Sequence, residues 1–404
     1  MANNCRCSKF FKMSSNQTLI RKLSIASALF VLLVSAVLLI NACQPEEETW
    51  QPTPYHLQIP RFFPQQLNIP DDNPLTVEGV ELGRYLFYDS RLCGYTGSDP
   101  DSMLSCADCH AQAHNFDVGT DNPRFPDGVT HGVTGIPTPH SPMPLVNLVF
   151  NHNGYFWNGM IHKDNPDPNR RSLENVVTMG IQAPHEMNST VDKAIAALKQ
   201  VDYYPSMFKK AFGTEEITRE RIEKAVAQFL RVLVSANSKF DRYLRGEEQL
   251  TAQELRGYVL FTTEEGADCF HCHGSDGNPL FTTNDFYNNA LSATHDDSRD
   301  RFAVTGKAND HGAYRAPSLR NVAVSAPYMH DGRFKTLDEV LEFYNSGLVN
   351  SPYVHPYMHK IDEGGRHLTP TQIADLKAFI LTLTDEDFLS DPRFAKPDKL
   401  NVKK

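Results

Sequence analysis

Two copies of one short motif constrain this chain more than any other feature of its sequence. Each copy has two cysteines separated by two residues and followed at once by a histidine, at residues 106–110 and 269–273. This spacing is the attachment signature of a c-type haem, because both thiols bond to one porphyrin edge and the histidine reaches the iron. A disulfide, a thioredoxin-like redox pair or half of a zinc site are the alternatives, and the repetition in a chain with eight cysteines favours haem. We predict two covalent c-type haems, with these attachment residues: Cys106, Cys109, His110, Cys269, Cys272 and His273.

The first 42 residues differ from the rest of the chain. They hold five basic residues and no acidic one, and residues 23–42 form an uncharged, apolar stretch that ends directly before Cys43. This order is typical of a secretory signal. Residues 39–43 resemble a bacterial lipobox, which predicts lipidation at Cys43 and a periplasmic body anchored to a membrane. An uncleaved transmembrane anchor is the alternative, since about 20 apolar residues can span a bilayer.

The charge of the chain excludes some classes of partner. The formal net charge is −10 at pH 7, and it becomes −15 without the five basic residues of the first 42. An acidic chain argues against a nucleic-acid-binding face. No Gly-rich phosphate loop, Gly-x-Ser-x-Gly elbow or His-Glu-x-x-His helix occurs in the sequence. An acidic body favours a basic protein partner, mainly through the rate of encounter.

The chain around the two motifs repeats. A helix is predicted before each motif, near residues 75–87 and 250–261, and Thr251 with Glu254 forms a capping box at the start of the second. An amphipathic helix is predicted to close each unit, starting at Thr218 and at Thr369. Strand-like alternation is nearly absent, so we predict an all-α protein of two class I cytochrome c-like domains with long irregular loops. The predicted segments are a signal (1–42), a tether (43–74), an N-terminal domain (75–246) and a C-terminal domain (247–404).

Further motifs give this duplicated plan a family resemblance. They include Phe-Trp-Asn-Gly at residues 156–159, Glu-Met at 186–187, Arg-Ala-Pro-Ser-Leu-Arg-Asn at 315–321 and Ala-Pro-Tyr-Met-His-Asp-Gly at 326–332. In this order they resemble the bacterial di-haem cytochrome c peroxidase family, from about residue 75 to residue 385. The family includes classical peroxidases and MauG-type enzymes, which use the same scaffold to oxidise a partner protein.

The resemblance implies roles for residues around the N-terminal haem. The site on His110 would be the peroxidatic one, where Glu186 moves protons between the two peroxide oxygens. Trp157 would carry electrons between the two haems. His131 aligns with a loop histidine that ligates the peroxidatic iron in oxidised classical enzymes, and His140 is its rival in the same loop.

The resemblance also implies that the C-terminal haem, on His273, receives the electrons. Two residues are candidates for the sixth ligand of its iron. Tyr344 stands where classical peroxidases have a methionine and MauG-type enzymes have a tyrosine, and Met358 is the rival ligand. A phenolate stabilises ferric and higher iron states, whereas a thioether favours ferrous iron.

Two positions depart from the family pattern. Val176 stands ten residues before Glu186, where the family commonly has a glutamine. The family also binds calcium between the domains through an asparagine side chain and two backbone carbonyls. The carbonyl positions, Ser325 and Pro327, are present, but His140 or the next residue, Ser141, falls at the asparagine position, so a calcium ion is left open.

These observations predict a membrane-tethered, periplasmic di-haem peroxidase that reduces hydrogen peroxide to water. The predicted electron donor is a small cytochrome c or a cupredoxin, no nucleic-acid partner is expected, and a homodimer is left open. One alternative is a MauG-like enzyme that uses peroxide to oxidise a partner protein. The other is a di-haem electron-transfer protein without catalysis.

Overall fold

The structure is a computed structural model that describes residues 28, 30, 50–94, 103–275 and 277–401. The chain divides into two units, Met1–Gln51 and Pro52–Lys404. Of the predicted signal segment only Ala28 and Phe30 are described, both helical and exposed, and Cys43 lies outside the described residues. Among the residues described, no helix is both long and apolar enough to cross a membrane.

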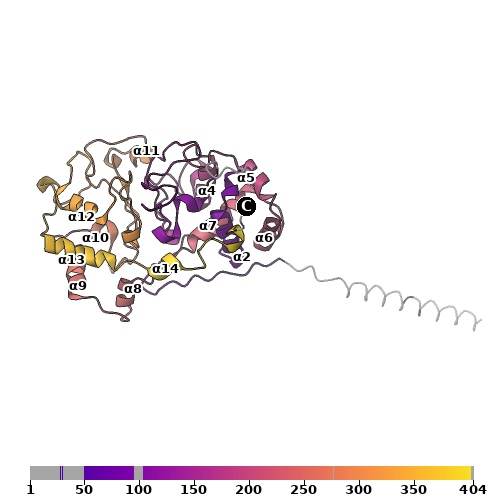
Figure 1. The fold of residues 1–404 in the computed structure, drawn as a ribbon, viewed down its shortest axis with the longest axis horizontal. Helices are drawn as coiled ribbons and strands as arrows, with labels where there is room; N and C mark the ends of the chain where they lie inside the picture. The colour runs from indigo at the N-terminus through magenta and orange to yellow at the C-terminus, as the bar shows by residue number, and fades with distance from the viewer. Residues whose placement is uncertain (1–27, 29, 31–49, 95–102, 276, 402–404) are drawn as a thin grey trace, which may run out of the picture. The chain divides into compact units, whose positions relative to one another are not determined.

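The second unit is mainly helical (Figure 1). Before residue 232 the helices are α2 (Val77–Tyr88), α3 (Cys106–Cys109), α4 (Leu173–Gln182), α5 (Val191–Leu198), α6 (Tyr203–Phe212) and α7 (Arg219–Arg231). After it come α8 (Lys239–Leu244), α9 (Ala252–Phe261), α10 (Phe270–His273), α11 (Phe302–Thr305), α12 (Leu337–Ser346), α13 (Pro370–Leu381) and α14 (Glu386–Ser390). Short 3-10 turns join them, at Ser90–Cys93, Gln112–His114, Leu148–Phe150, Pro168–Arg170, Ala308–Asp310, Val322–Val324, Ile361–Glu363 and Asp398–Asn401. The strands β1 (Phe286–Tyr287) and β2 (Tyr314–Arg315) form one antiparallel pair, so the mainly helical class predicted from the sequence is confirmed.

Threonine N-caps open the helices that the sequence pattern predicted. Thr76, Thr218, Thr251 and Thr369 each accept a hydrogen bond from a backbone N–H in the first turn of α2, α7, α9 and α13. Thr251 and Thr369 also form capping boxes with the Glu or Gln three residues further on. The predicted starts of these helices are therefore confirmed.

Each half of the second unit is organised by one close crossing of two helices, α2 with α7 and α9 with α13. A Cβ on Gly83 would lie 1.9 Å from the carbonyl oxygen of Ala225. A Cβ on Gly257 would likewise lie 1.9 Å from the carbonyl oxygen of Asp375. Only glycine permits backbones to approach this closely. The same contact at the same place in both halves supports the internal repeat found in the sequence.

The last residues of the chain pack on the first half. Phe388 of α14 and Phe394 are buried in the apolar core that α2 and α7 share. The ring centroid of Phe388 lies 5.8 Å from that of Phe116, and the Tyr88 hydroxyl donates to the carbonyl oxygen of Phe394 at 2.8 Å. The end of the predicted C-terminal domain thus contributes to the N-terminal core. The second core includes one aromatic residue from before the predicted boundary, Phe240, and three from after it: Phe261, Phe281 and Phe379.

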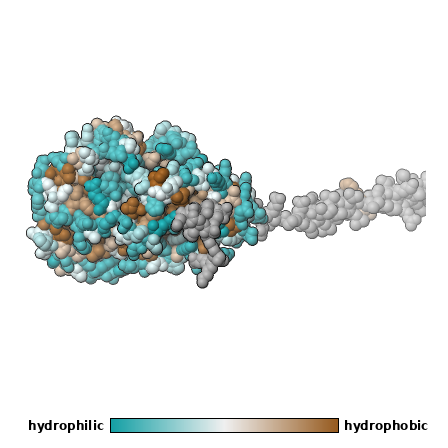
Figure 2. Space-filling view, turned by 45° about the horizontal axis from the view of Figure 1, so that its top comes forward, coloured by the Kyte–Doolittle hydropathy of each residue, from teal (hydrophilic) through white to brown (hydrophobic). Residues whose placement is uncertain are grey.

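The surface of the second unit is mostly polar on the face that Figure 2 shows. Apolar side chains are scattered there between hydrophilic ones and do not gather into one broad patch. Single exposed apolar residues of this kind are normal on folded proteins.

Candidate active site

The two cysteine motifs lie on two short helices with the same local design. The Nδ1 atom of His110 faces the carbonyl oxygen of Phe116 at 2.8 Å, and the Nδ1 atom of His273 faces that of Pro317 at 3.1 Å. A carbonyl can only accept, so each Nδ1 carries the proton and each Nε2 is free to bind iron. Burial lowers the pKa of both histidines to about 4, so both are neutral at physiological pH. The two histidines are therefore oriented in the same way to bind iron through Nε2.

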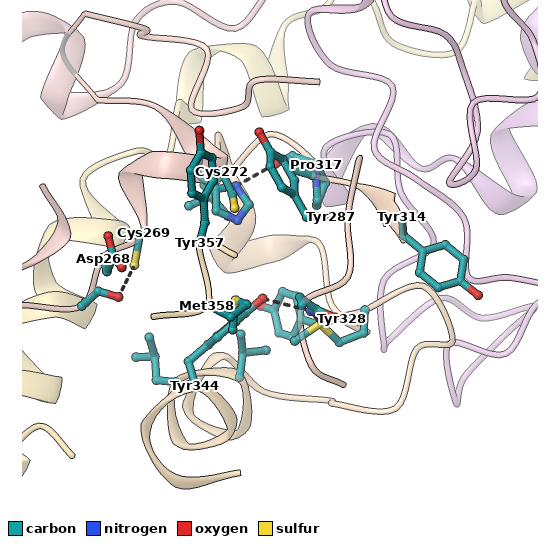
Figure 3. A pocket seen from close by; sticks show the side chains of 18 of the residues that line it. Asp268, Cys269, Cys272, Tyr287, Tyr314, Pro317, Tyr328, Tyr344, Tyr357 and Met358 are labelled. Carbon is teal, nitrogen blue, oxygen red and sulfur yellow. Dashed lines mark hydrogen bonds between the residues drawn. The ribbon is translucent and has the colours of Figure 1, made fainter. Parts of the chain in front are cut away.

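A cavity opens directly beside the C-terminal motif (Figure 3). Cys269, Cys272 and His273 lie in its wall, together with the two candidate sixth ligands, Tyr344 and Met358. Other parts of the wall are apolar, as a porphyrin requires: Leu319, Val322, Leu337, Val340, Leu341 and Ile380. The shape and lining of this cavity suit a haem attached to α10.

Tyr344 and Met358 both point into this cavity in Figure 3. Tyr344 lies on α12, and its hydroxyl accepts a hydrogen bond from Nδ2 of Asn289 at 3.1 Å. Val340, one turn earlier on α12, also lines the cavity, as the predicted helical spacing required. Burial raises the pKa of Tyr344. Since both side chains reach the cavity, the choice of Tyr344 as sixth ligand stays a prediction.

Arg315 shows that the cavity suits a negatively charged group. Its side chain is buried, and it lines the cavity from β2. In the described ranges its guanidinium contacts neutral groups, namely Oδ1 of Asn284 at 2.8 Å, the carbonyl oxygen of Phe156 at 3.4 Å and the sulfur of Met143 at 3.2 Å. Burial lowers the pKa of Arg315 to about 10. A buried cation is costly without a counter-charge, and the propionate of a haem would supply one.

Trp157 comes from the first half of the chain but lines the C-terminal cavity. The side chain is 8% exposed, and its Nε1 donates to the carbonyl oxygen of Ser141 at 2.8 Å. The backbone N–H of Arg315 donates to the carbonyl oxygen of Trp157 at 2.7 Å, which ties the segment to β2. This position fits the predicted electron relay between the haems, and the role itself stays a prediction.

Glu186 lies beside the N-terminal motif. Burial raises the pKa of Glu186 to about 7. Burial and then the Glu186 carboxylate raise the pKa of Cys106 to about 12 and that of Cys109 well above its usual value. Gly180, near the end of α4, makes room for this carboxyl, because a Cβ there would lie 2.9 Å from Oε2 of Glu186. The predicted catalytic acid thus lies close to the predicted peroxidatic haem site.

The loop that carries His131 docks on the backbone at Glu186. The Val133 N–H donates to the carbonyl oxygen of Glu186 at 2.9 Å, and a Cβ on Gly132 would lie 2.4 Å from the same oxygen. His131 is exposed, and its ring stacks edge-on against Phe125 at 5.1 Å between centroids. The structure therefore brings the His131 loop to Glu186, while iron ligation by His131 stays a prediction.

His140, the rival of His131, lies in a different place. Its ring centroid is 5.6 Å from that of Tyr314 and 5.9 Å from that of His330, and both of those residues line the C-terminal cavity. The Nε2 atom of His140 is buried and has no hydrogen-bond partner within the described part of the chain. Calcium prefers oxygen ligands, so an imidazole here does not fit the expected asparagine. The Oγ atom of Ser141, the other residue at this position, is also buried and without a hydrogen-bond partner in the described part of the chain, so a calcium ion here stays a prediction.

Comparison with known proteins identifies the family. A family model described as "Di-haem cytochrome c peroxidase" matches residues 77–249. The methylamine utilization protein MauG of Methylorubrum extorquens is 35% identical over 327 residues, which cover 80% of this chain and 83% of that protein. The chain belongs to the di-haem cytochrome c peroxidase family. Membership implies two c-type haems and makes the chain a peroxide-dependent oxidoreductase, as predicted.

Other members of this family support the same assignment. The cytochrome c551 peroxidase of Nitrosomonas europaea is 30% identical over 319 residues, which cover 78% of this chain and 86% of that protein. Among solved structures, a MauG-like protein associated with microbial copper homeostasis matches with a TM-score of 0.71 and 33% identity, over 85% of this chain and 99% of that one. The di-haem peroxidase BthA of Burkholderia thailandensis, at 22% identity and a TM-score of 0.63, shares the fold.

Sequence reasoning missed several residues that shape these sites. Asn289, which bonds Tyr344, belongs to no motif and had no signal in the sequence. Gly180 did have a signal in the sequence, because a glycine inside a helix is unfavourable and indicates a packing requirement. Arg315 was part of a recognised motif, but only the structure shows that it is buried and, among the described residues, bonded to neutral groups.

Proposed function

We propose that this di-haem peroxidase reduces hydrogen peroxide at the N-terminal site and takes up electrons at the C-terminal site. One difference between the two sites carries this division. The carboxyl of Glu186 lies beside Cys106 and Cys109, whereas the side chains of Tyr344 and Met358 line the cavity beside the other motif. When bound, each c-type haem supplies a redox-active iron. The protein supplies the proton transfers and the electron route.

Glu186 is the proposed proton carrier. A carboxyl with a pKa of about 7 can take a proton from one peroxide oxygen and return it to the leaving oxygen near neutral pH. Its Oε1 lies 3.9 Å from Nε2 of His185, which is 34% exposed and offers a route for protons to solvent. Reduction of each peroxide to two waters consumes two electrons and two protons, and the protons need such a route from solvent.

Electrons are proposed to enter at the C-terminal site from a small cytochrome c or cupredoxin. Trp157 lines the C-terminal cavity and is anchored both to Ser141 and to β2, so its indole is held in one orientation. A rigid aromatic side chain at this place suits electron transfer between the two haems. The acidic charge of the chain favours a donor with a basic surface.

A second candidate function is the peroxide-dependent oxidation of a partner protein, as in MauG-type enzymes. Tyr344 favours it, because a tyrosine in the C-terminal cavity would stabilise higher oxidation states of the iron. The similarity to relatives named MauG and to a MauG-like structure also favours it. The same first step with peroxide at Glu186 serves both functions, and they differ in where the electrons come from.

We also propose that the protein works in the periplasm, tethered through a lipid on Cys43. The support is the order of basic, apolar and cysteine residues in the first 43 positions. Fractionation of cells that express Cys43→Ser tests this, since the tether should then be lost or its processing blocked, whereas Cys7→Ser should behave as the unchanged protein.

The test of the proposed peroxidase function is the Glu186→Gln variant. Glutamine keeps the size of the side chain but cannot accept the proton, so peroxide turnover with a reduced small cytochrome should fall by ~10²-fold or more. Both haem absorption spectra should persist. Glu215→Gln, an exposed glutamate changed in the same way, is the control and should keep full turnover. Turnover of Glu186→Gln close to that of the control would remove Glu186 from the mechanism.

A further inference from the structure

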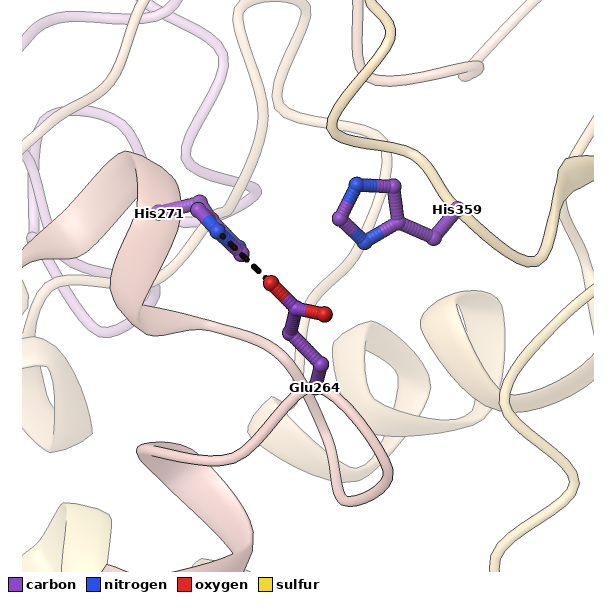
Figure 4. Close-up of side chains that lie close together, drawn as sticks. All are labelled: Glu264, His271 and His359. Carbon is purple, nitrogen blue, oxygen red and sulfur yellow. Dashed lines mark ion pairs between the residues drawn. The ribbon is translucent and has the colours of Figure 1, made fainter.

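We propose that Glu264, His271 and His359 form a binding site for a divalent transition-metal ion of the copper or zinc class, on the surface beside the C-terminal haem motif. Their potential ligand atoms all lie within 4.8 Å of one another (Figure 4). They come from three segments: the loop after α9, the helix α10 and the stretch between α12 and α13. This site is separate from the peroxidase function, because haem attachment uses the cysteines on either side of His271 and leaves its imidazole free.

One buried carboxylate orients both imidazoles. Asp268 has a side chain that is 3% exposed. Its Oδ1 faces Nδ1 of His271 at 2.6 Å, and its Oδ2 faces Nδ1 of His359 at 3.0 Å. A carboxylate accepts, so both Nδ1 atoms carry a proton, and in the neutral imidazoles the Nε2 atoms are the ones that can bind a metal ion. Histidine ligands of metal ions are typically held by a carboxylate in this way.

The backbone that presents Glu264 is also fixed. Arg366, whose side chain is 8% exposed, donates from Nε to the carbonyl oxygen of Gly266 at 2.9 Å and also bonds the carbonyl oxygen of Glu264. Its Nη1 lies 3.4 Å from Oδ2 of Asp268, so the same arginine also holds that side chain in place. The Glu264 side chain itself is 60% exposed. The site thus has an anchored frame and one mobile ligand.

The distances need only a small adjustment to hold an ion. Metal–ligand bonds of roughly 2.1 Å place the ligands of a tetrahedral ion roughly 3.4 Å apart. His271 Nε2 and Glu264 Oε1 are already 3.5 Å apart, and no separation in the set exceeds 4.8 Å. A shift on the order of 1 Å by Glu264 or His359, which are both exposed, would close the set. The fourth position would be left for water or for an outside ligand.

The ligand types select the class of metal. Two imidazoles and one carboxylate suit zinc and cupric ions, whereas calcium and magnesium prefer sites made entirely of oxygen, and cuprous ion prefers sulfur. Among divalent ions of this series copper binds most tightly to a given nitrogen and oxygen site. The ion would also join the segment of His359 to α10, and that segment carries Met358, which lines the C-terminal cavity. Metal binding would therefore hold a wall of the C-terminal haem site in place.

Calorimetric titration of the full-length protein, loaded with both haems and stripped with a chelator, tests the proposal. Zinc should bind to the unchanged protein, and its affinity should be more than 10-fold weaker in His271→Gln and in His359→Gln. Asp268→Asn, which removes only the orienting carboxylate, should weaken it 10–100-fold. The control is His152→Gln, an exposed histidine in the first half of the chain, which should bind as the unchanged protein does. Equal zinc affinity in His359→Gln and His152→Gln would overturn the proposal, as would the absence of binding to the unchanged protein.

A second measurement identifies the ligands. Cupric ion bound to the unchanged protein should show nitrogen coupling from two imidazoles in its electron paramagnetic resonance signal, and His359→Gln should reduce this to one. Each variant should first show two haems per chain by mass, and its circular dichroism should match that of the unchanged protein, which confirms that it folds. If Asp268→Asn fails this check, Glu264→Gln replaces it, because Glu264 is exposed and its loss leaves the frame intact. A copper signal that is the same in every variant would overturn the assignment.

Discussion

The two halves of the second unit use the same framework but differ in what surrounds the haem motif. In both, a threonine-capped helix crosses a later helix at a glycine. In both, Nδ1 of the motif histidine donates a hydrogen bond to a backbone carbonyl oxygen. In the first half, the long segment between α3 and α5 brings Glu186 to the motif. In the second half, Tyr344 and Met358 line the cavity instead. The duplicated helices therefore supply the support, and the segments between them supply the difference in chemistry.

The largest expected effect concerns one of the places where the two halves depend on each other. Phe388 lies in the last helix but is 3% exposed in the first core. Replacing a buried phenylalanine with alanine typically costs ~3–5 kcal/mol of the free energy of unfolding. We expect Phe388→Ala to lose about this much in denaturant unfolding, while Leu381→Ala, at a 45% exposed position of α13, should change it by less than about 0.5 kcal/mol. Equal losses would show that α14 is not part of the first core.

The next effect tests whether the two helix crossings are equivalent. In Gly83→Ala and Gly257→Ala the new methyl group would meet a backbone carbonyl oxygen at 1.9 Å, so the helices must separate. Overpacking of this kind typically costs about 1–3 kcal/mol. We expect both variants to be destabilised by similar amounts in the same unfolding experiment. Gly277→Ala is the control, because a Cβ there meets nothing within 4 Å. A large effect in only one of the two would break the equivalence.

A redox titration sharpens the contrast at the C-terminal site. If Tyr344 is the sixth ligand, Tyr344→Met should raise the potential of that haem, because a thioether favours ferrous iron. We expect a rise on the order of 100 mV, about 2.3 kcal/mol, within the ~0.8 V range that axial ligands command. Met358→Leu is the matched variant in the same cavity and should leave the potential and the low-spin signal unchanged. The opposite outcome, with Met358→Leu altering both, would assign the ligand to Met358.

The smallest expected effect, about 1.4 kcal/mol for each pH unit, is a pH dependence of the reaction at Glu186. Because burial raises the pKa of Glu186 to about 7, the group is a carboxylic acid below that pH and a carboxylate above it. Only the carboxylate can accept the first proton, so the rate of reaction with peroxide should fall about tenfold for each pH unit below 7 and level off above it. Stopped-flow measurements from pH 5 to 9 would show this. The inflection should be absent in Glu186→Gln, and its survival there would assign it to another group.

The supporting framework was predictable from the sequence to a large extent. The haem motifs, the capping threonines and the mainly helical class depend on local spacing, which a single sequence displays. The packing of Phe388 on Phe116 was not predictable, because residues so far apart in sequence leave no local pattern. For the same reason no local pattern showed that Phe240, before the predicted boundary, packs in the second core.

The site was predictable only where a motif carried it. The family resemblance pointed to Glu186, Trp157 and Tyr344, and the structure puts each of them beside a haem motif. The resemblance favoured His131 over its rival His140 only modestly, because both lie in one irregular loop. Folding sends His131 to the Glu186 side and His140 towards Tyr314, since the loop is fixed by contacts with distant backbone.

The return of the chain end to the first core has a consequence for biogenesis. Phe388 and Phe394 are synthesised after both haem motifs, yet they pack in the core that holds the first motif. A chain that lacks them would expose the apolar surface of that core beside Cys106 and Cys109. We therefore expect the thiols of the first motif to be accessible for haem attachment before residues 388–394 dock.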